Sequence, residues 1–379
     1  MARHGPEPRC RRRRRGRADG LVAHRRGHAR PPPLPPGDTS SRTPAAPRAI
    51  HCRTGSWWGG SLGEVRRRTA LVLASVFVPV IVVAAGFVFL VNAQSSGPFN
   101  AQRIYVDPQG AAATAVAEGN GDPVVERVAA TPTAVWLTPE EHGRGEVGGY
   151  VRSVVADAAT TGSVPVFVVY GVPNRDCGNF SVGGLSPTAY PEWVAEIASS
   201  LGEQRSVVIV EPDSLSLAIE CEDEDEQVDA IAGAVSMLAE TTAWVYVDGG
   251  HSNWRSADDM AALLRRVGID RIRGFSTNVS NFNPTSDERD YAETLSALVG
   301  GAHYVIDTSR NGAGSNGDWC NPSGRALGAT PLSEPTSGAM DANLWVKAPG
   351  ESDGACNGGP RAGAWWPSAV EELGRNAGW

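Results

Sequence analysis

Short apolar runs rich in β-branched residues alternate with longer segments over most of the chain, and this alternation constrains the fold more than any other feature. Runs that are apolar throughout are typical of strands buried on both faces of a parallel sheet. The segments between them are long enough for helices, as repeated βα units require. The predicted strands are Thr133–Leu137, Val164–Tyr170, Val207–Val210, Trp244–Val247, Ile272–Thr277, His303–Ile306 and Leu344–Val346. The predicted helices are Val147–Ala159, Pro187–Leu201, Glu226–Thr241, Ala257–Val267 and Ser286–Val299.

Residues 98–379 have the size of one α/β barrel domain. The seven runs are one strand fewer than a complete eight-stranded barrel has. We find no internal repeat, and no linker rich in Pro, Ser and Thr that would lead to a second domain. The sequence therefore predicts a single α/β domain over 98–379.

Charge divides the chain into two unlike parts. Residues 1–68 contain seventeen of the 34 basic and four of the 42 acidic residues, so the remainder carries a net charge of −21. Nucleic-acid binding requires a basic surface. We therefore expect no nucleic-acid partner for the acidic part.

The N-terminal part predicts an export signal behind a segment with no core. Residues 1–64 are rich in Arg, Pro, Gly and His, a composition typical of disorder. Residues 65–97 have three arginines, an apolar run over 70–91 and small residues after it, as in a signal peptide or a membrane anchor. Two interpretations stay open for 1–64: sequence upstream of a true start near Val65, or the inner tail of an anchored protein. Both predict a domain that is secreted, or anchored with the domain outside.

Four cysteines follow the export signal, an even number that suits an oxidising compartment. They allow three pairings, and we favour the two in which each bond closes one loop-bearing stretch. These pairs are Cys177–Cys221 and Cys320–Cys356.

Polar and aromatic side chains gather directly after the predicted strands. In a parallel barrel the carboxyl ends of the strands form one face, where active sites are built. Several carboxylates together with aromatic rings suit glycoside hydrolysis, which needs a protonated acid and a second carboxylate. Lys347, the single lysine of the chain, belongs to this set.

Six motifs, in order along the chain, resemble glycoside hydrolase family 6, the cellobiohydrolases and endoglucanases. The resemblance covers about residues 100–377. It implies a distorted seven-stranded parallel βα barrel and hydrolysis of β-1,4-glucans with inversion of configuration. The motifs are VVYGVPNRDCG (168–178), VEPDSL (210–215), YVDGGHSNW (246–254), VIDTSRNG (305–312), WCNP (319–322) and LWVKAPGESDGAC (344–356).

The resemblance implies four catalytic positions. Asp213 matches the general acid, and Asp176 matches the carboxylate that raises the pKa of that acid. Asp353 matches the disputed base, for which a chain of waters is the alternative. Tyr170 matches the residue that crowds the distorted sugar. An N-cap role for Asp213 and an ion pair for Asp353 are the structural alternatives.

The resemblance also implies eight residues that bind substrate or support the site. The tryptophans match platforms that stack on sugar rings, and burial in the core is the alternative for each. Lys347 and Glu351 match ligands of sugar hydroxyls, with a mutual ion pair as the alternative. The eight are Trp136, Asp248, His251, Trp254, Asn278, Trp319, Lys347 and Glu351.

One position departs from the family pattern. A serine six residues after the RDC aspartate helps to hold the catalytic water in much of the family, and Val182 stands there in this chain. Ser181 precedes it, so a shift of one residue in the loop would restore the hydroxyl.

Three functions stay open. The first is an inverting endoglucanase, which the short segments 313–343 and 354–366 favour because they leave the cleft open. The second is an exo-acting cellobiohydrolase, and the third is a non-catalytic extracellular protein that binds carbohydrate. We expect no cofactor and no metal site, since the histidines are scattered and the cysteines suit disulfides. The oligomeric state is not predicted.

Overall fold

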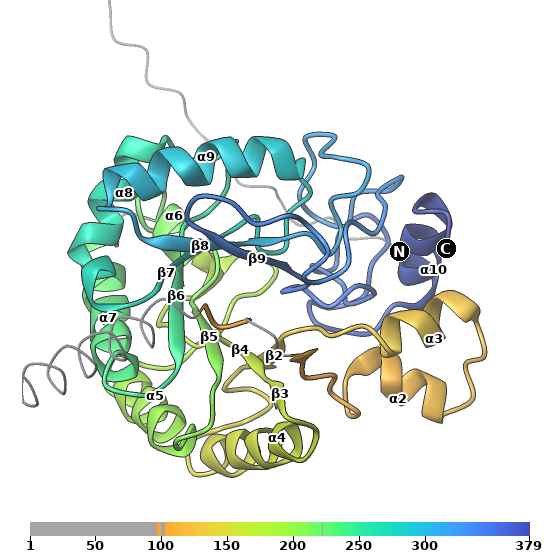
Figure 1. The fold of residues 1–379 in the computed structure, drawn as a ribbon, viewed down its shortest axis with the longest axis horizontal. Coiled ribbons are helices and arrows are strands. Elements are labelled where there is room, and N and C mark those ends of the chain that lie inside the picture. The colour runs from red at the N-terminus through yellow and green to blue at the C-terminus, as the bar shows by residue number, and fades with distance from the viewer. Residues whose placement is uncertain (1–96, 100–102, 222) are drawn as a thin grey trace, which may run out of the picture. The chain divides into compact units, whose positions relative to one another are not determined.

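The computed structural model describes residues 97–99, 103–221 and 223–379. One parallel sheet with the strand order β2-β4-β5-β6-β7-β8-β9 curls around its own axis (Figure 1). The predicted seven-stranded parallel α/β barrel is therefore confirmed. Its strands are β2 Val135–Leu137, β4 Val166–Val169, β5 Val207–Val210, β6 Trp244–Asp248, β7 Gly274–Thr277, β8 His303–Asp307 and β9 Met340–Leu344.

The last predicted strand was wrong in position, because β9 ends where Leu344–Val346 was expected to begin. Two polar residues hide β9 in the sequence. The side chain of Asn343 is buried and donates hydrogen bonds to Thr308 Oγ1 and the Thr330 carbonyl. Asp341 is paired with a cation, as described below. Buried polar side chains with partners fit inside a sheet, but they break the apolar pattern from which strands are predicted.

The second predicted strand is divided by a proline. Pro165 has no N–H to donate, and it separates β3 (Ser163–Val164) from β4. Strand β3 pairs with β1 (Arg103–Ile104) in a separate two-stranded sheet.

The five predicted helices are all present and lie outside the sheet (Figure 1). Two helices start at the predicted residues, Val147 and Ala257, and the other ends differ from the predicted ends by one to three residues. They are α4 Val147–Thr161, α5 Ala189–Ser200, α7 Glu224–Leu238, α8 Ala257–Arg266 and α9 Thr285–Leu298.

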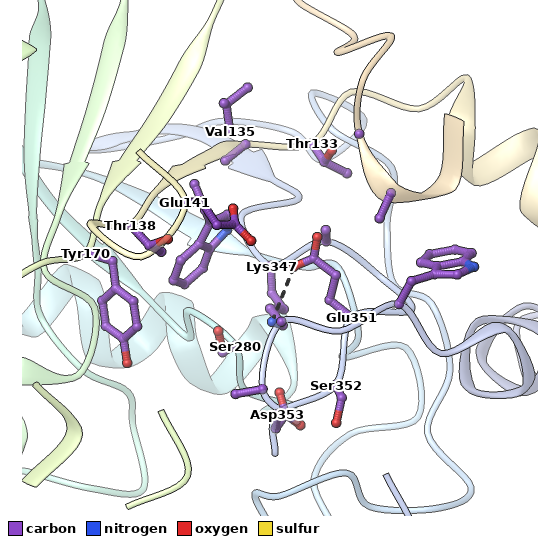
Figure 2. A pocket seen from close by; sticks show the side chains of 18 of the residues that line it. Thr133, Val135, Thr138, Glu141, Tyr170, Ser280, Lys347, Glu351, Ser352 and Asp353 are labelled. Carbon is purple, nitrogen blue, oxygen red and sulfur yellow. Dashed lines mark ion pairs between the residues drawn. The ribbon is translucent and has the colours of Figure 1, made fainter. Parts of the chain in front are cut away.

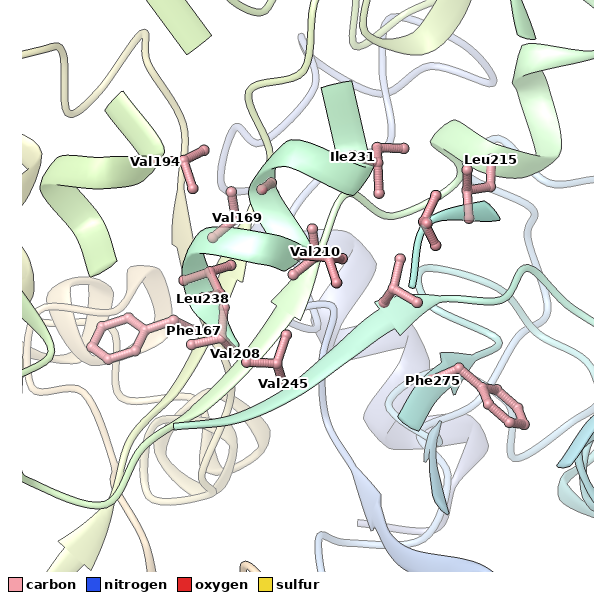
Figure 3. Close-up of a cluster of buried hydrophobic side chains, with 14 of the residues drawn as sticks. Phe167, Val169, Val194, Val208, Val210, Leu215, Ile231, Leu238, Val245 and Phe275 are labelled. Atoms are coloured by element: carbon pink, nitrogen blue, oxygen red, sulfur yellow. The ribbon is translucent and has the colours of Figure 1, made fainter. Parts of the chain in front are cut away.

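Alternate strand residues face two separate cores, which explains why the runs are apolar throughout. Phe167 and Val208 pack outward against the helices, with Ile231 and Leu238 of α7 in the same cluster (Figure 3). Their neighbours in sequence, such as Val168, pack inside the barrel. Burial on both faces is the pattern expected of parallel strands.

A third apolar cluster joins three helices that the sequence did not predict. Helices α2 (Ala111–Ala117), α3 (Pro123–Ala129) and α10 (Pro367–Asn376) pack around Val125, Trp345 and similar residues. Two of the three have only seven residues, which is too short for a clear helical period. Further short helices are α6 Ser214–Ala218, η1 Asp176–Gly178 and η2 Ile269–Arg271.

The edges of the barrel meet without forming a ladder within the described residues. The Ala134 amide donates to the Trp345 carbonyl at 3.0 Å, and Trp136 Nε1 donates to the Val346 carbonyl at 2.9 Å. The barrel is therefore distorted at the seam between β2 and β9, where it is only loosely closed.

The predicted disordered segment (1–64) and the predicted signal or anchor (65–97, apart from Gly97) lie outside the described residues. Within the described ranges, no helix has the length and apolar character needed to cross a membrane.

Candidate active site

A cleft of about 660 Å³ lies at the carboxyl ends of the strands and along the seam. It contains all four predicted catalytic residues and four of the eight predicted binding residues. The predicted residues that line it are Trp136, Tyr170, Asp176, Asp213, Trp319, Lys347, Glu351 and Asp353.

Asp213 lies partly buried in this cleft, just after β5. Its backbone is left-handed, with a φ of 67°, and although it occupies the N-cap position of α6 its side chain makes no capping hydrogen bond. Burial raises the pKa of Asp213 well above its usual value, and the charges of Asp248, Asp176 and Asp353 raise it further. A raised pKa favours the protonated form of the carboxyl group, which is the form that the predicted role of general acid requires.

Asp248, at the end of β6, binds the backbone of Asp213. It is buried and accepts hydrogen bonds from the Asp213 amide at 3.1 Å, the Gly250 amide at 2.9 Å and Ser276 Oγ at 3.2 Å. Burial is the main cause that raises the pKa of Asp248 to about 7. Since Asp248 is not among the lining residues, its contact is with Asp213.

Asp176 is carried by the loop after β4, and the predicted disulfide between Cys177 and Cys221 ties this loop down. Asp176 Oδ2 accepts a hydrogen bond from the Ser181 amide at 2.6 Å, and burial raises the pKa of Asp176. The structure therefore brings a second carboxyl group into the cleft that contains Asp213.

Arg175 fixes the same loop against Tyr170. Its guanidinium donates to the Tyr170 carbonyl at 2.7 Å, lies 4.6 Å from the centre of the Tyr170 ring and forms two bonds with Glu140. Burial raises the pKa of Tyr170 well above its usual value, so this phenol stays neutral.

The loop position that departs from the family pattern lies at the cleft. Val182 is 62% exposed and lines the cleft together with Ser181. The Ser181 amide donates a hydrogen bond to Asp176. A serine hydroxyl is therefore present in this loop, one residue before the position where the family pattern has it.

Asp353 forms an ion pair with Arg310 at 2.9 Å, and its Oδ2 also accepts the Asn321 amide at 3.0 Å. The predicted disulfide between Cys320 and Cys356 joins the two loops that carry these groups. The structural alternative for Asp353 is thus observed, but the residue also lines the cleft.

Lys347 and Glu351 form the ion pair that was the alternative to sugar binding, with 3.6 Å between Nζ and Oε2 (Figure 2). Lys347 Nζ also lies 5.5 Å from the centre of the Trp136 ring, and that ring meets Tyr170 edge to face at 5.2 Å. A cation, a carboxylate and an indole therefore meet in one part of the cleft.

Besides Asp248, three predicted binding residues lie outside the lining of the cleft. Asn278 is fully buried and donates to the carbonyls of Asn283 and Asp307. Trp254 donates its indole N–H to Glu220 and packs beside His251, whose pKa burial lowers to about 4. Their roles in sugar binding stay predictions.

Sequence reasoning placed Glu211 directly after a strand but gave it no role, and it begins the turn that leads to Asp213. Glu211 is fully buried, and its two oxygens accept the Gly171 amide at 3.0 and 3.1 Å while Tyr190 donates at 2.8 Å. Burial is the main cause that raises the pKa of Glu211 to about 7. The residue connects the end of β4 to the end of β5. Its position directly after an apolar strand was the feature of the sequence that pointed to a role at the site.

Comparison with known proteins identifies the family. The family model for Glycosyl hydrolases family 6 matches residues 99–377. The solved endoglucanase Cel6 of Mycobacterium tuberculosis, in complex with a thio-cellobioside, is 44% identical with a TM-score of 0.72, over 75% of this chain and 100% of that chain.

Curated relatives agree with this assignment. Endoglucanase A of Cellulomonas fimi is 43% identical over 73% of this chain, and this chain spans 61% of the length of that relative. A probable 1,4-beta-D-glucan cellobiohydrolase C of Neosartorya fischeri is 26% identical over 75% of this chain and 79% of that protein. The predicted family is confirmed, and the chain belongs to the glycosyl hydrolases family 6.

Proposed function

We propose that the protein hydrolyses internal β-1,4-glucosidic bonds of cellulose-type glucans with inversion of configuration. The proposal rests on the different surroundings of two carboxyl groups in one cleft, those of Asp213 and Asp353. Burial and neighbouring carboxylates favour the protonated form of Asp213, while Asp353 is held by Arg310. The inverting mechanism requires one protonated carboxyl group and one carboxylate that act on the same glycosidic bond.

In the proposed reaction Asp213 donates its proton to the glycosidic oxygen as the bond from that oxygen to the anomeric carbon breaks. A water attacks the anomeric carbon from the opposite face and gives its proton to a base. Asp353 is the proposed base, directly or through a second water. The inverted sugar and the freed hydroxyl of the leaving chain are the products. Asp213 then regains a proton from solvent, and the base releases to solvent the proton that it took from the water.

The other lining residues are proposed to hold the chain in place. The Trp136 ring offers a flat apolar surface to a sugar ring, and Lys347 and Glu351 offer a donor and an acceptor to its hydroxyls. Tyr170, braced by Arg175, limits the space at the reacting sugar. The names of the more similar relatives support internal cleavage over release of cellobiose from chain ends.

We further propose that the domain works outside the cell, secreted or anchored. The two disulfides support this, because such bonds persist in oxidising compartments. The apolar run over 70–91 is the proposed signal or anchor.

The test uses a soluble β-1,4-glucan and follows viscosity, reducing ends and the anomer first released. Internal cleavage lowers viscosity steeply for few new reducing ends, and inversion releases the α-anomer first. Release of cellobiose with little loss of viscosity would assign the exo mode. A first product of β configuration would exclude inversion, and no reducing ends at all would leave a binding protein.

A further inference from the structure

Two aromatic rings from different loops form one exposed apolar surface at the rim of the cleft. Phe180 is 46% exposed and Trp319 is 50% exposed, although large apolar side chains are usually buried. Their ring centres lie 5.9 Å apart with the planes tilted by 49°, so the rings touch. Both line the cleft that contains the three aspartates.

Each ring is anchored beside a reacting loop. Phe180 lies three residues after Cys177, in the loop that carries Asp176, and Trp319 directly precedes Cys320. The backbone of Gly354, next to Asp353, runs under Phe180: a Cβ at this glycine would lie 2.3 Å from the Phe180 Cβ. The two rings are therefore held by tethered backbone rather than by a free loop.

This rim surface is separate from the aromatic group around Trp136. Trp136 contacts Tyr170 and lies near Lys347, whereas Phe180 belongs to the loop that carries Asp176. Trp319 lies between β8 and β9, in the loop that the Cys320–Cys356 bond joins to the loop of Asp353. The cleft thus has two separate aromatic surfaces, and the carboxylates line the same cleft.

We infer that Phe180 is a glucan-binding residue, which extends the Trp319 ring into a two-ring platform for a sugar residue away from Trp136. The inference rests on the proposed function and names the ligand as a β-1,4-glucan long enough to reach both aromatic positions. Rings in contact leave no space for a sugar between them, so the sugar lies on their shared outer surface. Each pyranose ring presents C–H groups on its face, which suits a flat apolar surface.

The test measures binding in an Asp213→Asn background, so that the ligand is not consumed. Phe180→Leu keeps apolar volume but removes the flat face, Phe180→Tyr keeps the flat face, and Leu332→Ala is the control for an exposed apolar residue outside the cleft. Cellohexaose binding is measured by calorimetry, and the unfolding midpoint of every variant is recorded. We expect Phe180→Leu to weaken binding about tenfold, with Phe180→Tyr and Leu332→Ala within about twofold of the parent.

The other outcomes overturn the platform. Equal binding by Phe180→Leu and the parent would show that the ring does not contact the glucan. Equal loss in the Leu and Tyr variants, with lower unfolding midpoints, would assign Phe180 to loop packing alone. Absence of binding by the parent would also end the proposal.

Hydrolysis by the unmutated protein is measured separately, which keeps the two proposals distinguishable. New reducing ends together with unchanged binding in Phe180→Leu would refute the platform and leave the hydrolase. Weakened binding in Phe180→Leu without hydrolysis by the unmutated protein would leave the platform and refute the hydrolase.

Discussion

At the carboxyl end of the barrel Asp213 has no ion-pair partner among the described residues, whereas at the amino end Asp341 is surrounded by donors. Arg273 binds Asp341 through two nitrogens at 2.8 and 2.7 Å, and Tyr246 and His303 contact it as well. A second cavity of about 340 Å³ lies there, lined by Arg273, His303 and Asp341.

The difference shows how one residue type serves two purposes in one barrel. A carboxyl group kept from water beside like charges holds a proton that it can give away. A carboxylate bound by a guanidinium is fixed in its charged form, and here it links β9 to Arg273, directly before β7, across the intervening strand β8. The carboxyl end is thus organised for reaction and the amino end for stability, as in other parallel barrels.

The largest expected effect tests the reactive end. Asp213→Asn should lower hydrolysis of an unactivated glucan by roughly 10²–10⁴-fold, because the amide cannot donate the proton. Folding and glucan binding should persist. The rate is measured from reducing ends, and binding by calorimetry. Near-normal rates would remove Asp213 from the acid role.

The next effect tests the stabilising end. Asp341→Asn should lower the free energy of unfolding by about 3 kcal/mol, because the largely buried side chain of Arg273, 16% exposed, loses its counter-charge. The folded variant should keep its rate, since Asp341 does not line the cleft.

Denaturant unfolding measures this loss, with Glu371→Gln as the control. Glu371 pairs with Arg375 on the surface at 3.8 Å, and such a pair contributes about 1 kcal/mol or less. Equal small losses in both variants would erase the contrast between the two ends.

A third effect tests the buried Glu211 through pH. Its pKa is raised from 4.5 to about 7, so its contribution to stability is complete below pH 4.5 and is lost as the pH rises through 7. Gln cannot ionise, so Glu211→Gln should gain stability relative to the unmutated protein by about 3 kcal/mol across that window. Unfolding free energies at pH 4 and pH 8 measure the change. A difference independent of pH would mean that Glu211 does not titrate there.

The smallest effect tests how far the reactive end extends. Trp136→Ala should raise KM for a soluble glucan about tenfold, through loss of the stacking surface. Trp254→Ala should change KM by less than about twofold, because that indole does not line the cleft. A larger effect at Trp254 would restore its predicted role as a platform.

The sequence predicted those parts of the fold and site that local pattern determines. Strands such as Val207–Val210 follow from unbroken β-branched residues, and the place of Asp213 in the cleft follows from its position directly after such a strand. The position of strand β9 was not predicted, because the side chains of Asp341 and Asn343 are polar and their partners are distant in sequence.

The direction of side chains at strand ends was also beyond the sequence. Asn278 ends a strand as the other candidates do, yet it points into the protein, where its partners are carbonyl groups. Likewise, the contact between Phe180 and Trp319 joins two loops far apart in the chain, and no local pattern encodes it.

The two disulfides lie beside the aspartates of the cleft, so the arrangement of the cleft depends on the compartment in which the protein folds. Cys177 adjoins Asp176, and the bond between Cys320 and Cys356 closes the loops around Asp353. Thiols stay reduced in most cell interiors, and disulfides persist in oxidising compartments. For the exported domain proposed above, both disulfides would therefore form only when oxidation follows export. Under that proposal, the same four cysteines stabilise the domain and determine when the loops around Asp176 and Asp353 become fixed.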